Sequence, residues 1–147
     1  MLPEQIALTL YTLRDYCRDV TSLRSTLKKV KEIGYPAIQV SGVGVQDPKV
    51  IRELAEDVGL TICATHEPPN KILEEPIAVV ERLNALGCKH TAFPHPGSYA
   101  IDSMEACLEL SKRLEGSGKL LRDGGKQLSY HNHELEFVRY ENQSILE

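Results

Sequence analysis

The hydrophobic positions of the chain recur at a helical spacing in about four segments. In the first segment they are three or four residues apart, as on one face of a helix: Leu23, Leu27, Val30 and Ile33. We expect this helix to begin near Thr21, with Thr21 or Ser22 as its N-cap, because a hydroxyl there can accept a backbone N–H.

Three later segments show the same spacing. In the second, Asp47 and Pro48 are expected as the N-cap and first residue of a helix, a position that tolerates proline. In the fourth, Gly116 and Gly118 should weaken the helix by roughly 1 kcal/mol each. The apolar positions of the three segments are Val50, Leu54 and Val58, then Ile77, Val80, Leu83 and Leu86, then Met104, Cys107, Leu108, Leu110, Leu114, Leu120 and Leu121.

Each periodic segment is followed by a glycine and then by a short apolar run. The pattern is seen in VKEIGYPAIQV, AEDVGLTICAT, LNALGCKHTAF and LRDGGKQLSYH. Glycine closes a helix in the left-handed conformation, and the expected positions are Gly34, Gly59, Gly87 and either Gly124 or Gly125. With an earlier strand at 6–10, this order of elements predicts an α/β fold with a parallel sheet of about five strands.

Histidines gather where the predicted strands end. In parallel α/β folds, functional side chains lie at the carboxyl ends of the strands. The histidines that follow strands are His66, His95, His131 and His133, whereas His90 precedes its strand. Histidine and carboxylate side chains together suit a divalent metal or general acid–base catalysis. A histidine that only caps a loop is the alternative for each one taken singly.

The run HNHELE, residues 131–136, concentrates this chemistry. In an extended segment His131 and His133 point to the same side, with Asn132 opposite. A turn after His133 would redirect Glu134 and Glu136, so the sequence leaves open which carboxylate faces the site. Elsewhere, Arg14 is a candidate for binding an anionic or hydroxylated substrate, with a surface salt bridge as the alternative.

The composition argues against a nucleic-acid or membrane partner and against secretion. The 147 residues carry a formal charge of −4, and no basic run points to nucleic acid or an anionic membrane as a partner. The four cysteines are not spaced as a metal motif, and we expect reduced thiols. The first residues lack the basic start of a signal peptide, and no apolar run approaches the ~20 residues of a membrane span. We therefore expect a cytoplasmic protein.

Four stretches together carry a family resemblance: AIQVSGVG, GLTICATHE, LGCKHTAFP and YHNHELEF. They resemble sugar phosphate isomerase/epimerase proteins of the xylose-isomerase-like (β/α)8 superfamily. The resemblance implies a TIM barrel that uses a divalent metal (Mn, Co, Zn or Mg). It also implies proton transfer on carbon beside a carbonyl or hydroxyl of a sugar, keto-sugar or cyclitol. It leaves isomerase, epimerase, dehydratase and lyase open.

The resemblance also implies roles for individual residues. His66 matches a histidine that lines the pocket after strand three, and the HNHELE run matches the part that faces metal and substrate. The expected catalytic residues are His66, His133 and Glu136; the expected substrate-binding residues are Arg14, Asn132 and His95; the expected metal ligands are His131 and Glu136.

The chain departs from this family in length. Such barrels need about 250 residues, and the resemblance runs from strand one only through strand five. The family takes most of its metal ligands from strands six to eight. We therefore expect residues 1–147 to be the N-terminal portion of such a barrel, inactive by itself. The alternatives are a homodimer of half-barrels joined through their open sheet edges, and a non-catalytic module that binds a partner there.

Overall fold

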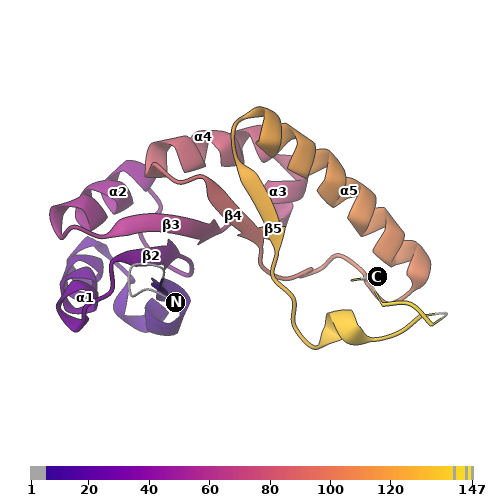
Figure 1. Ribbon diagram of the computed structural model, residues 1–147, viewed down its shortest axis with the longest axis horizontal. Helices are drawn as coiled ribbons and strands as arrows, with labels where there is room; N and C mark the ends of the chain where they lie inside the picture. The colour runs from indigo at the N-terminus through magenta and orange to yellow at the C-terminus, as the bar shows by residue number, and fades with distance from the viewer. Residues whose placement is uncertain (1–5, 141, 145, 147) are drawn as a thin grey trace. The chain divides into compact units, whose positions relative to one another are not determined.

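The computed structural model describes residues 6–140, 142–144 and 146. It has the predicted α/β fold, with five parallel strands that follow one another in chain order (Figure 1). The chain divides into two compact units. The first is Met1–His66 with Glu81–His90, and the second is Glu67–Val80 with Thr91–Glu147.

The first unit contains the strands β1 (Ala7–Thr9), β2 (Ala37–Val40) and β3 (Thr61–His66). They pair in parallel, with Ala7 opposite Ala37 and Ala37 opposite Thr61. The register between β2 and β3 shifts after Ile38. Ile38 and Val40 are buried, so the middle strand supplies apolar side chains to the core of this unit.

Helix α1 (Val20–Ile33) begins one residue earlier than the sequence suggested, and its N-cap is Asp19. The Asp19 carboxylate accepts the Ser22 backbone N–H at 2.8 Å, and the Ser22 hydroxyl accepts the Asp19 N–H at 3.1 Å. This reciprocal capping box satisfies two backbone donors, which neither Thr21 nor Ser22 could do alone as N-cap. The prediction of Thr21 or Ser22 was therefore wrong.

The other helices of the first unit follow their local signals. A 3-10 helix, η2 (Leu10–Tyr16), leads out of β1. Helix α2 (Pro48–Asp57) has Asp47 as its N-cap, accepting the Lys49 N–H at 2.9 Å, and Pro48 as its first residue, which confirms the prediction. In Figure 1, α1 and α2 lie beside the strands of this unit.

The second unit contains α3 (Pro69–Glu74), β5 (Gln127–Tyr130), the 3-10 helix η3 (Leu135–Phe137), and α5 (Met104–Asp123). Two elements cross the boundary between the units, α4 (Pro76–Leu86) and β4 (His90–Phe93). Helix α3 was not predicted, because six residues are too few to show an apolar period. The expectation of about four helices was thus one too low among the described residues.

Helix α5 continues through Gly116 and Gly118 despite their low helix propensity. Ser103 caps its start by accepting the Ala106 N–H at 3.2 Å. Ser117 is buried, and a side chain at Gly118 would meet Leu128 of β5 at 3.9 Å. That distance is an ordinary van der Waals contact, so the helix does not need glycine there to pack on the strand. The tertiary contacts of the helix outweigh the low propensity of its two glycines.

The glycines that follow helices behave as predicted. Their φ angles are positive: 110° at Gly34, 72° at Gly59, 68° at Gly87 and 73° at Gly125. Gly125, and not Gly124, takes the left-handed conformation after α5. Local sequence therefore fixed where each of these helices ends.

The apolar stripes of the helices form most of the core. Leu23, Leu27 and Val30 of α1 are fully or almost fully buried. Ile33 is 73% exposed because it is the last residue of α1, where no further turn packs against the sheet. Ile77, Leu108 and Leu120 are exposed as well, contrary to the periodic pattern.

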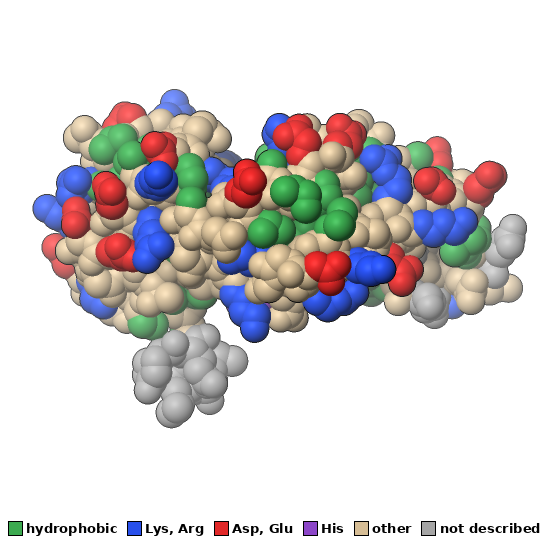
Figure 2. Space-filling view, turned by 90° about the horizontal axis from the view of Figure 1, so that it is seen from above, with side chains coloured by type: hydrophobic (Ala, Val, Ile, Leu, Met, Phe, Trp, Pro, Cys, Tyr) green, Lys and Arg blue, Asp and Glu red, His purple; other side chains and the backbone are tan. Residues whose placement is uncertain are grey.

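The surface carries charges of both signs. On the face shown in Figure 2, acidic and basic side chains are interspersed with hydrophobic ones. Within the described residues, no helix is both long and apolar enough to cross a membrane. All four cysteines are free, as expected, and burial raises the pKa of the Cys17, Cys63 and Cys107 thiols.

Candidate functional site

Three histidine side chains of the second unit lie together, and we call His95, His131 and His133 the histidine cluster. The ring centroids of His95 and His133 are 5.1 Å apart, and those of His131 and His133 are 4.9 Å apart. All three residues are exposed. The His131 backbone N–H donates to the Phe93 carbonyl at 3.0 Å, which holds the segment after β5 beside the end of β4.

A backbone hydrogen bond determines which ring nitrogen of His95 carries the proton. The Gly97 N–H donates to His95 Nδ1 at 2.8 Å. Nδ1 is therefore an acceptor, so the neutral ring carries its proton on Nε2. His95 thus offers an N–H donor, which suits its expected role in binding a substrate oxygen. A metal could use Nδ1 only by displacing the Gly97 N–H.

Glu136 follows His133 by three residues and is fully buried. One carboxylate oxygen accepts the Tyr130 hydroxyl at 2.8 Å, and the other accepts the His133 backbone N–H at 2.6 Å. Strand β5 ends at Tyr130, and the turn into η3 directs Glu136 inward while Glu134 remains exposed. The structure thereby answers which way each of the two carboxylates turns.

These contacts have opposite effects on the two titratable partners. Burial by itself would raise the pKa of Glu136, but hydrogen bonds from the His133 N–H and the Tyr130 hydroxyl outweigh it and hold the pKa below its usual value. Burial, followed by the hydrogen bond to Glu136, raises the pKa of Tyr130. Glu136 is therefore an anion, and Tyr130 a neutral donor, around neutral pH.

His66 and Arg14 belong to the first unit. His66 ends β3 and is half-buried, with its Nδ1 3.3 Å from the Ser41 hydroxyl. The Arg14 guanidinium lies 4.5 Å from the Tyr11 ring centroid and donates to the Tyr11 carbonyl at 2.8 Å. Arg14 is thus held by its own 3-10 helix. Asn132 is exposed and lies between His131 and His133 in the sequence.

The described residues do not fit a divalent metal by themselves. Among them, no group of three or more His, Cys, Asp or Glu side chains is arranged to hold one. His95 Nδ1 and both oxygens of Glu136 already accept hydrogen bonds. Protein metal sites for zinc ordinarily take three or four side-chain ligands, so this part of the chain does not supply a complete set.

Sequence reasoning passed over two residues near the candidate site residues. Tyr130 directly precedes the HNHELE run, and a partly buried tyrosine hydroxyl needs a hydrogen-bond partner. Glu67 follows His66 and is only 4% exposed. A glutamate is rarely so buried unless it is paired, but nothing in the sequence indicates burial at that position.

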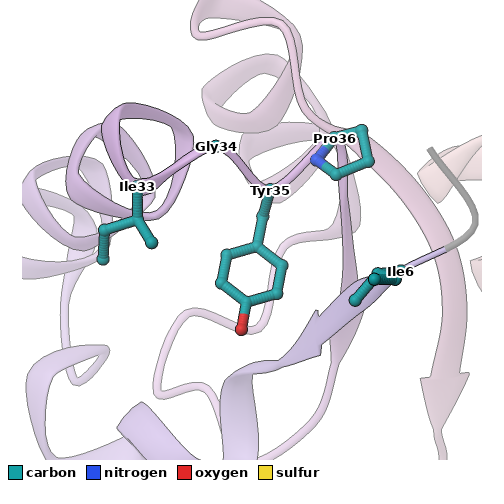
Figure 3. Close-up of a pocket in the computed structure, with 5 residues that line it drawn as sticks. All are labelled: Ile6, Ile33, Gly34, Tyr35 and Pro36. Carbon is teal, nitrogen blue, oxygen red and sulfur yellow. The ribbon is translucent and has the colours of Figure 1, made fainter. Parts of the chain in front are cut away.

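The first unit has an apolar pocket of about 280 Å³ that none of the candidate site residues lines. Its lining is Ile6, Ile33, Gly34, Tyr35 and Pro36, and the Tyr35 ring lies between Ile33 and Ile6 (Figure 3). Ile6 directly precedes β1, and Pro36 directly precedes β2. The pocket is therefore at the amino ends of the strands, whereas parallel α/β folds bind substrates at the carboxyl ends.

Comparison with known proteins gives matches in structure alone. No protein-family model matches the chain, and no curated protein is significantly similar. A sugar phosphate isomerase/epimerase from Parabacteroides distasonis matches with a TM-score of 0.80 and 19% identity, over 95% of this chain and 55% of that one. An L-ribulose 3-epimerase matches with a TM-score of 0.61 and 14% identity, over 84% of this chain and 48% of that one.

The same fold also serves different chemistry. A family 2 AP endonuclease from Brucella melitensis matches with a TM-score of 0.61 and 14% identity, over 73% of this chain and 48% of that one. The chain spans about half the length of each of these structures. At such identities the likeness is one of fold. The chain therefore has the fold of about half of the matched structures, among them a sugar phosphate isomerase/epimerase.

Proposed function

We propose that the chain contributes the histidine-lined edge of a site that moves a proton on a sugar, keto-sugar or cyclitol. The observation that carries the proposal is the gathering of three exposed imidazoles, with ring centroids 4.9 and 5.1 Å apart, where β4 and β5 end. A histidine side chain can both accept and donate a proton, which suits general acid–base catalysis.

The chemistry assigns a role to two of the rings. His133 accepts the proton from carbon beside the substrate carbonyl, and the C–H electron pair forms the carbon–carbon double bond of an enediolate. His95 donates Nε2–H to the oxygen on which negative charge develops. Return of the proton to the former carbonyl carbon, with the hydroxyl proton moving to the former carbonyl oxygen, gives an isomer. Protonation of the original carbon on its opposite face, by solvent on that side, gives an epimer. No step is assigned to a metal, because the described ligands are incomplete.

The matched structures support this class of substrate. Two of them are named as a sugar phosphate isomerase/epimerase and an L-ribulose 3-epimerase. The endonuclease match shows that the fold alone would not select a sugar. Since the chain spans about half of these proteins, the proposal for residues 1–147 is substrate binding and proton exchange, with full turnover belonging to a complete barrel.

Proton exchange can be measured directly. The chain would be incubated with a panel of ketoses and cyclitol ketones in D₂O, and deuterium incorporation beside the carbonyl followed by NMR. We expect exchange above the buffer rate with the wild type and the His90→Ala variant, and loss of exchange with His133→Ala. His90 is a matched control because it is exposed and lies at the start of β4.

The same samples test substrate binding. The imidazole signals of His95 and His133 should shift on addition of the substrate, whereas those of His90 should stay in place. If no sugar shifts the cluster signals and none exchanges its proton faster than in buffer, the proposed function is wrong. Calorimetric titration with Mn²⁺, Co²⁺, Zn²⁺ and Mg²⁺ tests the metal: we expect no saturable micromolar binding, since the described ligand set is incomplete.

A further inference from the structure

We propose that Glu136 is a positioning residue, which together with Tyr130 forms a clasp that fixes the backbone of His133 and so sets the histidine cluster. The resemblance to sugar isomerases had suggested Glu136 as a proton carrier and metal ligand. The proposal deepens the proposed function and rests on it, because it concerns the same site.

The clasp closes a short segment onto itself. Tyr130 is the last residue of β5, and its hydroxyl donates to one oxygen of Glu136 at 2.8 Å. The other oxygen accepts the His133 N–H at 2.6 Å. One buried carboxylate therefore joins the residue before the HNH run to the last residue of that run, and the backbone between them is held at both ends.

Two further contacts anchor this segment to β4. The Tyr130 ring packs against Phe93, with ring centroids 5.6 Å apart. The His131 N–H donates to the Phe93 carbonyl at 3.0 Å. The backbones of His131 and His133 are thus both bound, and their rings project from fixed points. These backbone contacts explain how the exposed side chains of His131 and His133 come to lie side by side.

The same geometry argues against a direct chemical role for Glu136. The side chain is fully buried, and each oxygen already accepts a hydrogen bond. A substrate or metal ion would have to open the packing around this side chain to reach either oxygen. Such an opening would put the hydrogen bonds from Tyr130 and His133 at risk, and a buried donor left without its partner is costly.

Amide hydrogen exchange of His133 tests the clasp in the chain as it is. Glu136→Gln keeps the volume of the side chain but removes its charge and one acceptor. We expect exchange of the His133 N–H to accelerate on the order of tenfold or more, with loss of the nuclear Overhauser contact between the His95 and His133 rings. Glu134→Gln is the matched control, since Glu134 is exposed two residues away, and should leave both readouts unchanged.

Tyr130→Phe provides a milder variant in case Glu136→Gln impairs folding. It removes only the hydroxyl and keeps the ring against Phe93, so the His133 N–H should exchange faster than in the wild type but slower than in Glu136→Gln. Unchanged amide protection in α5, which belongs to the same unit, would confirm that each variant folds. Wild-type exchange at His133 in Glu136→Gln would overturn the proposal.

Addition of Zn²⁺ to the wild type separates positioning from metal binding. If Glu136 positions His133, the His133 N–H keeps its slow exchange with Zn²⁺ present. If Glu136 is a metal ligand, Zn²⁺ must break the clasp and accelerate that exchange, which would overturn the proposal. None of these readouts needs a substrate, so they can succeed or fail independently of the proton-exchange experiment.

Discussion

The His95 ring and the Glu136 carboxylate show how single hydrogen bonds to the backbone set the roles of candidate residues. The Gly97 N–H occupies Nδ1 of His95 and leaves Nε2–H as a donor. The His133 N–H occupies one oxygen of Glu136, and the Tyr130 hydroxyl occupies the other. In both cases the residue type permits several chemistries, and these contacts show which of its atoms are already hydrogen-bonded.

At Gly44 it is close packing that restricts which residue type the position accepts. A Cβ at this position would lie 2.0 Å from the Arg18 carbonyl oxygen, and the Gly44 N–H donates to the Cys17 carbonyl at 2.8 Å. The glycines of SGVG therefore let two backbone segments approach. We expect Gly44→Ala to lower the free energy of unfolding by about 1–3 kcal/mol, as overpacking usually does, measured by urea denaturation. A neutral result would contradict this packing.

At the scale of elements, capping residues and glycines predicted correctly where helices begin and end. The apolar period predicted less well which side chains are buried. Asp47–Pro48 begins α2, and Gly34 ends α1, as predicted. The apolar period also marked Ile77, Leu108 and Leu120 as inward-facing, yet all three are exposed. A period defines a helical face, but tertiary packing decides how much of that face is covered.

Gly116 in α5 offers a stabilising substitution. It is exposed inside the helix, and a Cβ there would meet nothing within 4 Å. Gly116→Ala should raise the free energy of unfolding by about 0.5–1 kcal/mol, because alanine has the higher helix propensity. Thermal and urea unfolding followed by circular dichroism would measure it. Gly34→Ala is the contrasting control and should destabilise, since Gly34 has a φ of 110°.

The cap of α1 predicts a dependence on pH. Hydrogen bonds from the Ser22 N–H and the Ser22 hydroxyl hold the pKa of Asp19 below its ordinary value of 3.8. A lowered pKa in the folded state means that the cap stabilises the protein above pH 3.8 and that this contribution is lost as the pH falls through the folded pKa. Urea unfolding at a series of acid pH values would show the loss.

Asp19→Asn isolates that contribution. Asparagine caps helices about as well as aspartate but does not titrate in this range. The difference in stability between the wild type and Asp19→Asn should therefore shrink as the pH falls below 3.8. High salt should reduce the difference at pH values where Asp19 is ionised, because the group is exposed. A difference that does not change with pH would contradict the assigned cap.

At the scale of the whole molecule, the chain combines the fold of sugar isomerase/epimerase barrels with about half their length. Its contacts group into two units, each with its own buried apolar residues. In the first unit the core includes Leu27 and Ile38, and in the second it includes Phe93 and Leu121. The histidine cluster lies in the second unit, whereas His66 and Arg14 lie in the first.

This division predicts where a core substitution acts. Leu27 is fully buried in α1, and Leu27→Ala should cost about 2–5 kcal/mol. We expect amide hydrogen exchange, followed by mass spectrometry, to accelerate mainly in peptides of the first unit. Leu121→Ala in α5 is the matched control for the second unit. Equal acceleration throughout the chain with either variant would mean that the units unfold together.

The sequence by itself determined the order of helices, glycines and strands, and hence the α/β class. These features depend on residues close together in the chain: an apolar period, a cap and a left-handed glycine. It also indicated which loops carry histidines. Only the tertiary structure decided that His95 meets His133, that Glu136 turns inward to Tyr130, and that Ile33 remains exposed. Such contacts join separate elements or follow a turn, so no local pattern specifies them.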